Sequence, residues 1–356
     1  MFVITNRSIE DEQAEGVNKF GKKPNAEGPN ELRLFEAKKL TRKWKINLIE
    51  DKLTDRHKLE VGIPLEEEAY ASKYVAKKIL KRVRKEKRDL VFFIHGFNND
   101  LESVLERAQE LERQYHVEVI AFSWPANGGG ISGVISYKSD KRDARASAGA
   151  VYRSLAKTRS YLNAFNEELM DDIHTRAIEE HPDNAEERQH FITRMADKGC
   201  PFKVTLLAHS MGNYLFKQIQ SSTIYDEHHM LFDNVILAAA DTNNAHHAQW
   251  VDRIRCRRKI YICINEDDSA LTASRIKSGE EQQARLGHYL HGLNSQQALY
   301  VDVTNAPYVG GEHAYFEGRP VKNKNGKLYK FFNDALHGKR AEEHLKFKVS
   351  SKTWCP

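Results

Sequence analysis

One short stretch of the chain carries residues that could perform nucleophilic chemistry. An apolar run from Val204 leads into the five residues 208–212, Ala-His-Ser-Met-Gly, and apolar residues then recur at helical spacing. This pattern predicts a buried parallel strand, a sharp turn and a helix, with Ser210 held out above the sheet as a nucleophile. Small residues at 208 and 212 suit the close approach of strand and helix, although Ala208 stands where the usual pattern has glycine. The alternative is an ordinary strand, turn and helix with a capping serine.

A serine hydroxyl is a weak nucleophile at neutral pH, so a base and an acid are also needed. With this kind of turn, the order along the chain is serine, then carboxylate, then histidine. Asp268, directly after the apolar strand predicted at 259–265, is the favoured acid. Asp241 and Asp267 are alternatives, and each of the three could instead cap a helix.

The base should follow the acid in the sequence. The candidates that we consider are His288, His291, His313 and His337. We favour His313, because it follows the last predicted strand, 298–303, by the length of a loop. We disfavour His209, His246 and His247, because they precede Asp268 and fit this order poorly.

A second loop could supply the oxyanion hole. The continuous apolar run 90–94 predicts a central strand, and it leads into His95-Gly-Phe-Asn-Asn99. In proteins with a serine turn, a loop of this H-G type offers one backbone amide, and the residue after the serine offers another. We assign these amides to Phe97 and Met211, with Asn98 as the alternative to Phe97. The competing interpretation is a tight turn before a helix. Four residues are candidates for a pocket beside the site: His95, Asn98, Trp124 and His209.

The sequence predicts no metal or cofactor. The pairs His228-His229 and His246-His247 are adjacent, unlike the i, i+4 pair of a zinc helix. The glycine run 128–130 matches no nucleotide-binding pattern.

Composition limits the class of protein. The 356 residues are 40% hydrophobic and 29% charged, which indicates a globular chain with a charged surface. A net charge of +5 does not by itself imply nucleic-acid binding, and we expect none. The four cysteines lack C-x-x-C spacing, and neither a signal peptide nor a membrane span is evident. We therefore expect a reduced, cytoplasmic protein with no transmembrane segment.

The elements that position these residues alternate between strand and helix. This order predicts an α/β fold with a mostly parallel, doubly wound sheet flanked by helices. We expect one domain over 1–356: N-terminal strands and a loop in 1–64, a core at about 65–320, and a basic tail over 321–356. Within it, 11–30 is predicted as a loop, and a helix is predicted to start at Pro64. A charged helical insertion at about 167–198, before the serine strand, could be a lid or an arm that binds a protein partner.

Several of these motifs together resemble a bacterial α/β-hydrolase family of unknown function, of the DUF900 type. The resemblance covers about residues 90–316. The matching segments are His95-Gly-Phe-Asn-Asn99, Phe122-Ser-Trp-Pro125, Ala208-His-Ser-Met-Gly-Asn213, Asp268-Ser-Ala-Leu271, Arg285-Leu-Gly287 and His313-Ala-Tyr315. It implies the α/β-hydrolase fold, and it implies that Ser210, Asp268 and His313 stand where a catalytic triad would be. It implies no substrate.

The resulting hypothesis is a serine hydrolase, similar to esterases and lipases, that cleaves an ester or related acyl bond through an acyl-enzyme. Its substrate would be a small or lipid-like acyl compound. Two alternatives stay open. One is a catalytically silent or partner-gated binding or effector protein, with the insertion or the basic tail as the contact. The other is an acyltransferase with the same triad.

Overall fold

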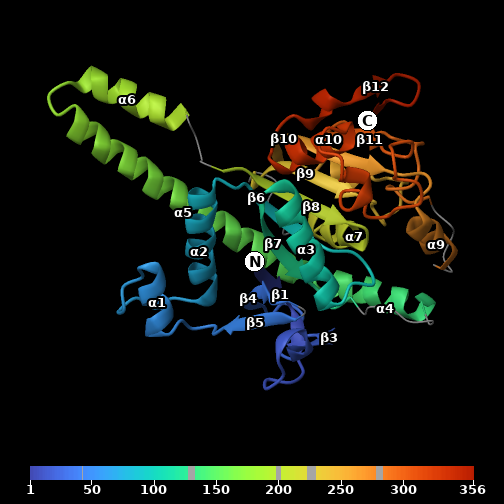
Figure 1. Cartoon of the computed structure of the whole chain (residues 1–356), viewed down its shortest axis with the longest axis horizontal. Helices are drawn as coiled ribbons and strands as arrows, with labels where there is room; N and C mark the ends of the chain where they lie inside the picture. Colours follow the sequence, from blue (N-terminus) through green and yellow to red (C-terminus); the bar gives the residue numbers. More distant parts are fainter. Residues whose placement is uncertain (42, 127–132, 198–201, 223–229, 278–283) are drawn as a thin grey trace.

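The computed structural model describes residues 1–41, 43–126, 133–197, 202–222, 230–277 and 284–356. In this part of the chain, eleven strands form one large sheet in the order β12-β13-β11-β10-β9-β8-β6-β7-β1-β4-β5 (Figure 1). The sheet strands are β1 (Phe2–Thr5), β4 (Arg33–Lys39), β5 (Trp44–Ile49), β6 (Leu90–Ile94), β7 (Glu118–Ser123), β8 (Val204–His209), β9 (Phe232–Ala238), β10 (Cys256–Ile264), β11 (Ala298–Asp302), β12 (Lys346–Lys348) and β13 (Thr353–Cys355).

The sheet is mostly parallel. Every neighbouring pair from β13 across to β1 is parallel, and only the outer pairs β12/β13, β1/β4 and β4/β5 are antiparallel. The fold class predicted from the alternation of strands and helices is therefore confirmed. Both ends of the chain contribute strands, because β1 pairs with β7 while β13 pairs with β11.

Helices cover both faces of the sheet. The helices are α1 (Asp55–Val61), α2 (Ala71–Glu86), α3 (Leu101–Tyr115), α4 (Gly133–Ala146), α5 (Ala148–Glu180), α6 (Ala185–Asp197), α7 (Met211–Gln220), α8 (Ala248–Val251), α9 (Ser269–Lys277) and α10 (Lys327–Leu336). Alternate residues of β6 face opposite layers. Phe92 packs with α2, α5 and α7, whereas Phe93 packs with α3 and α10. This alternation is the period-2 pattern of a strand that is buried on both faces.

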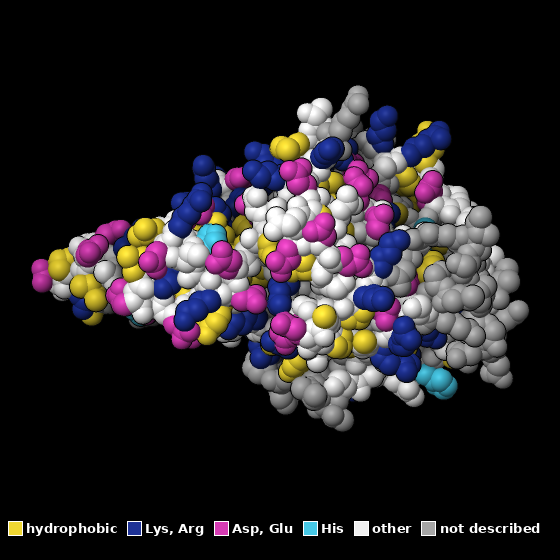
Figure 2. All heavy atoms as spheres, turned by 90° about the horizontal axis from the view of Figure 1, so that it is seen from below, with side chains coloured by type: hydrophobic (Ala, Val, Ile, Leu, Met, Phe, Trp, Pro, Cys, Tyr) yellow, Lys and Arg dark blue, Asp and Glu magenta, His cyan; other side chains and the backbone are white. Residues whose placement is uncertain are grey.

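Helices α5 and α6 form an arm that projects from the body (Figures 1 and 2). Helix α5 has 33 residues, which corresponds to a length of about 50 Å. A small apolar cluster of Ile173, Ala177 and Phe191 joins the two helices. The charged insertion predicted at 167–198 thus corresponds to the outer part of α5, which already begins at Ala148, and to α6. Lysine, arginine and acidic side chains alternate along the face of the arm in Figure 2.

Two local predictions were wrong. Residues 11–30 are not only loop, because β3 (Phe20–Pro24) pairs with β2 (Arg7–Ile9). The helix predicted from Pro64 begins at Ala71, because residues 65–67 form a turn instead of the first helical turn. The tail contains β12 and β13, which extend the sheet. The glycine run 128–130 and the pair His228-His229 lie outside the described residues. Among the described helices, none is both long and apolar enough to cross a membrane.

Candidate active site

The C-terminal ends of the parallel strands bring the candidate residues to one edge of the sheet. Strand β8 ends at His209, and α7 begins at Met211, so Ser210 alone makes the turn. Its backbone has φ 53° and ψ −123°, a conformation that non-glycine residues rarely adopt. Hydrogen bonds from neighbouring groups hold the backbone in this strained conformation. Ser210 N donates to the Ala238 carbonyl at 3.0 Å. The side-chain amide of Asn213 donates to three carbonyls, those of Ala208, Ser210 and Ala238.

Glycines make this turn possible. A Cβ atom on Gly212 would lie 2.5 Å from the Ile94 carbonyl oxygen, so β6 and α7 approach each other too closely for any side chain there. The first small residue of the motif, Ala208, is fully buried in β8. The sequence reasoning about close approach at positions 208 and 212 therefore agrees with the packing.

Asp268 and His313 form a hydrogen-bonded pair. The Nδ1–H of His313 donates to Asp268 Oδ2 at 2.7 Å, because an ionised carboxylate can only accept. The other oxygen, Oδ1, accepts the amides of Ala270 and Leu271 at 2.9 Å each. Asp268 thus caps α9 and orients the histidine, two roles that the sequence presented as alternatives. With its proton on Nδ1, His313 keeps Nε2 free to accept a proton.

The His313 loop is fixed against the turn that carries Ser210. The Asn265 side chain donates to the carbonyls of Gly310 and Glu312, which precede His313. The ring of His313 lies 4.6 Å from that of His209, the residue before Ser210. The His313 side chain is 24% exposed, whereas Asp268 is fully buried. The described contacts include no hydrogen bond between the Ser210 hydroxyl and the His313 ring.

A third loop faces the serine. Gly96 follows β6, and a Cβ atom placed on it would lie 2.6 Å from Ser210 Cβ and 3.1 Å from Ser210 Oγ. The Asn99 side chain donates to the carbonyls of Gly96 and Phe97, and Asn98 adopts φ 59°. In the described contacts, neither the Phe97 amide nor the Met211 amide donates to a protein group. The loop that the sequence assigned to an oxyanion hole is therefore adjacent to Ser210.

We expect Gly96→Ala to damage the site without unfolding the protein. The added methyl group would overlap Ser210 Cβ, so either the 95–99 loop or the serine must move. A shift of about 1 Å at a reacting group costs on the order of 100-fold in rate. Measurements of acyl-ester turnover and of the melting temperature, made on the wild-type protein and on Gly96→Ala, test this prediction. A Gly96→Ala protein with wild-type turnover would contradict the placement of this loop.

His95 and Trp124 hold this loop through hydrogen bonds and ring stacking. His95 donates from Nδ1 to the Gly96 carbonyl at 2.9 Å and accepts the Trp124 amide at Nε2 at 3.1 Å. The Trp124 indole donates to the His95 carbonyl, and the two rings stack 5.1 Å apart. Both side chains are fully buried, and His209 is 1% exposed. Of the four predicted pocket residues, only Asn98 is exposed. The other three have almost no exposed surface in this structure.

Acidic pH should destabilise the fold, because His95 is buried. Burial, together with the Arg7 guanidinium, lowers the pKa of His95 to about 3, whereas an unfolded histidine titrates near 6.5. The stabilisation is therefore complete above pH 6.5 and is lost as the pH falls toward 3. Between pH 7.5 and 5.5 we expect this residue to lower the free energy of unfolding by about 1.4 kcal/mol.

Urea unfolding at the two pH values measures this loss in the wild-type protein and in His95→Gln. The variant should lack this part of the pH dependence. His246→Gln, which removes an exposed imidazole, is the matched control. The same loss in wild type and His95→Gln would contradict the account.

His209 belongs to a network that the sequence did not predict. It donates from Nε2 to the His313 carbonyl at 3.1 Å, and Arg107 approaches its Nδ1 at 3.4 Å. Arg107 also pairs with Glu317 at 2.8 Å. Burial lowers the pKa of His209, and the nearby His313 and Arg107 lower it further. A neutral His209 can therefore hold the backbone of the histidine loop.

The alternative acids and bases have other partners. Asp241 is buried, accepts hydrogen bonds from Tyr137 at 3.0 Å and from Ser274 at 2.8 Å, and forms an ion pair with Arg285 at 3.1 Å. Tyr137 packs edge-on against Phe97, so Asp241 supports the 95–99 loop indirectly. Asp267 is exposed, and no contact with a histidine side chain is described for it.

The other histidines are held elsewhere. The His288 ring contacts Thr272, and His337 pairs with Asp89 on a different part of the sheet. The His291 carbonyl accepts from Asn244. His247, which precedes the acid, contacts Tyr300. The described residues contain no group of three or more His, Cys, Asp or Glu that could hold a metal ion.

A mostly parallel sheet flanked by helices, with a strained serine between β8 and α7, defines the class of α/β hydrolases. The family model for alpha/beta hydrolases of unknown function, DUF900, matches residues 71–164 and 166–297, which is more than half of the chain. The protein belongs to this family. No curated protein and no solved structure matches the chain. Ser210 and Asp268 fall inside the matched residues, whereas His313 lies beyond them, so its assignment rests on geometry.

Proposed function

We propose that the protein is a serine hydrolase that cleaves an ester or a related acyl bond. The observation that carries the proposal is the hydrogen bond of 2.7 Å between His313 Nδ1 and Asp268 Oδ2, made beside the strained turn of Ser210. This bond sets the tautomer of the base. The Asn265 and His209 contacts position its backbone.

In the proposed reaction, Ser210 Oγ attacks the substrate carbonyl carbon while His313 Nε2 takes the hydroxyl proton. The carbonyl oxygen becomes an oxyanion, which would accept from the amides of Phe97 and Met211. His313 then gives its proton to the leaving alcohol as the carbon–oxygen bond breaks, and an acyl-enzyme remains. Water attacks the acyl-enzyme with His313 again as base, and this step releases the acid and restores Ser210. Asp268 stabilises the imidazolium form of His313 throughout.

The residues that perform this scheme need no cofactor. An acyltransferase would use the same groups, with another nucleophile in place of water in the second half. The product distinguishes the two, because hydrolysis releases the free acid whereas transfer retains the acyl group on an acceptor.

Turnover of a panel of acyl esters tests the proposal. Esters of one leaving group, with acyl chains of two to sixteen carbons, should show leaving-group release by the wild-type protein, with a preference for a limited range of lengths. A brief reaction followed by mass measurement should show the intact protein heavier by one acyl group. A folded protein that neither turns over any ester nor gains an acyl group would favour a silent or partner-gated protein over the hydrolase.

A further inference from the structure

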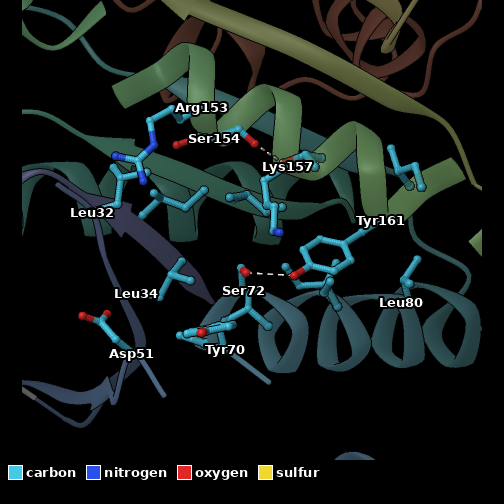
Figure 3. Close-up of a pocket in the computed structure, with 18 of the residues that line it drawn as sticks. Leu32, Leu34, Asp51, Tyr70, Ser72, Leu80, Arg153, Ser154, Lys157 and Tyr161 are labelled. Atoms are coloured by element: carbon cyan, nitrogen blue, oxygen red, sulfur yellow. Dashed lines mark hydrogen bonds between the residues drawn. The ribbon is translucent and has the colours of Figure 1, made fainter. Parts of the chain in front are cut away.

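A cavity lies away from the candidate active site, between α2 and α5 (Figure 3). Its volume is about 540 Å³, within the range of about 300–1,000 Å³ that small-molecule sites occupy. The apolar part of its wall comes from the sheet and from α2. The principal apolar residues are Ile4, Leu34, Val75, Ile79, Leu90 and Ile120.

The cavity exists because small side chains face each other across the two helices. Ala71, Ser72 and Ala76 line it from α2, and Ser154 and Thr158 line it from α5. Apolar walls that lack partner atoms forgo dispersion contacts. An apolar chain that enters this space would restore those contacts and would leave water.

The cavity also has a polar edge. Ser72 Oγ and Tyr161 OH are hydrogen bonded at 2.8 Å, and in Figure 3 Lys157 extends from α5 toward this pair. The Lys157 ammonium lies 5.4 Å from the Tyr161 ring centre and forms no ion pair among the described residues. A second cation, Arg153, is partly neutralised by Glu31 at 3.4 Å. Lys157 is therefore the charge most available to an anion at this edge.

The cavity is separate from the candidate active site. Ser210, Asp268 and His313 do not line it. Its floor includes Leu90, the first residue of β6, whereas Gly96 follows the end of that strand. Four residues of strand correspond to about 13 Å along the sheet.

We propose that this cavity binds a fatty acid. The alkyl chain would lie along Val75, Ile79 and Leu90, and the carboxylate would meet the Lys157 ammonium and the Ser72 and Tyr161 hydroxyls. This binding site is independent of the proposed hydrolase reaction and requires no bond to form or break.

Titration of the full-length protein with a fluorescent dansyl-labelled undecanoic acid tests the proposal, with unlabelled dodecanoate as competitor. We expect saturable binding of one probe per chain. Ala76→Leu should weaken binding by about tenfold or more, because its side chain would occupy the cavity. The variant should also melt at or above the wild-type temperature, since it fills an apolar space. Its turnover and its reaction at Ser210 should be unchanged, which separates this site from an acyl pocket at the serine.

The charge on the ligand is tested separately. Lys157→Gln should weaken dodecanoate binding about two- to fivefold, as expected for an exposed ion pair. It should leave competition by dodecanol, which has no charge, unaltered. Lys81→Gln, an exposed change on α2 outside the cavity, is the matched control. Absence of saturable binding, or wild-type affinity in a folded Ala76→Leu protein, would overturn the proposal. Equal losses for dodecanoate and dodecanol in Lys157→Gln would overturn the role of the ammonium.

Discussion

Ser210→Ala is expected to reduce acyl-ester turnover by about a millionfold relative to the wild-type protein, the scale seen when a nucleophile that acts as part of a triad is removed. The hydroxyl is the only group of this residue that the proposed reaction uses. Its backbone, which makes the strained turn at φ 53°, would keep the same hydrogen bonds to neighbouring main chain. Alanine retains the Cβ atom, so the packing against Gly96 is also preserved. The loss should therefore be chemical and not structural.

Two measurements isolate this effect. The rate of leaving-group release from the best ester of the panel gives the turnover, and thermal unfolding shows that the variant is folded. Ser221→Ala, which removes an exposed hydroxyl after the last residue of α7, is the matched control and should retain full turnover. Residual activity of one tenth or more in Ser210→Ala would mean that another group performs the attack.

Asp268→Asn should lower kcat by about 10⁴-fold with little loss of stability. The two oxygens of Asp268 have different partners, which makes this separation possible. An asparagine that keeps its oxygen toward the amides of Ala270 and Leu271 still caps α9. Its NH2 group would then face His313 Nδ1, where two donors cannot pair. His313 would carry its proton on Nε2, the wrong nitrogen for accepting the serine proton.

Two further variants divide the roles of Asp268. Asp268→Ala should lose both the pair with His313 and the cap, and the cap alone is worth about 1 kcal/mol of unfolding free energy. Asp267→Asn changes the exposed neighbouring carboxylate and should leave kcat close to the wild-type value. Equal kcat values for Asp267→Asn and Asp268→Asn would contradict the assignment of the acid.

Local sequence patterns predicted the elements whose signals are strong. The apolar run predicted as a strand at 90–94, for example, has the bounds of β6. Sequence patterns gave wrong secondary-structure predictions where other interactions overrode the local preference. Pro64 followed by carboxylates is typical of a helix start, yet these residues form a turn. Just before α2 begins, Tyr70 instead forms an isolated β-bridge with Lys52. Strand β3 contains a glycine, two lysines and a proline, a composition that favours a loop.

The residue types of the candidate site and their order along the chain could be predicted from the sequence, but the contacts among them could not. The pattern around Ser210 is local, so the sequence alone carries it. The choice among the acids depended on which carboxylate a distant histidine reaches, and only the folded chain joins residues 268 and 313. The Glu317–Arg107–His209 network connects residues up to 210 positions apart and has no local signal. Burial of His95 and Trp124 also depends on packing across the sheet, so no local pattern could indicate it.

Labelling with a fluorophosphonate probe shows directly whether Ser210 is an activated nucleophile. The probe forms a covalent bond to a serine that is activated by a base, and peptide mass analysis identifies the modified residue. We expect one label on Ser210 in the wild-type protein and none in Ser210→Ala. Labelling should be slower by orders of magnitude in His313→Ala and should keep the wild-type rate in His288→Ala. Folded wild-type protein without a label on Ser210 would contradict the hydrolase proposal. Loss of labelling in His288→Ala but not in His313→Ala would contradict the choice of base.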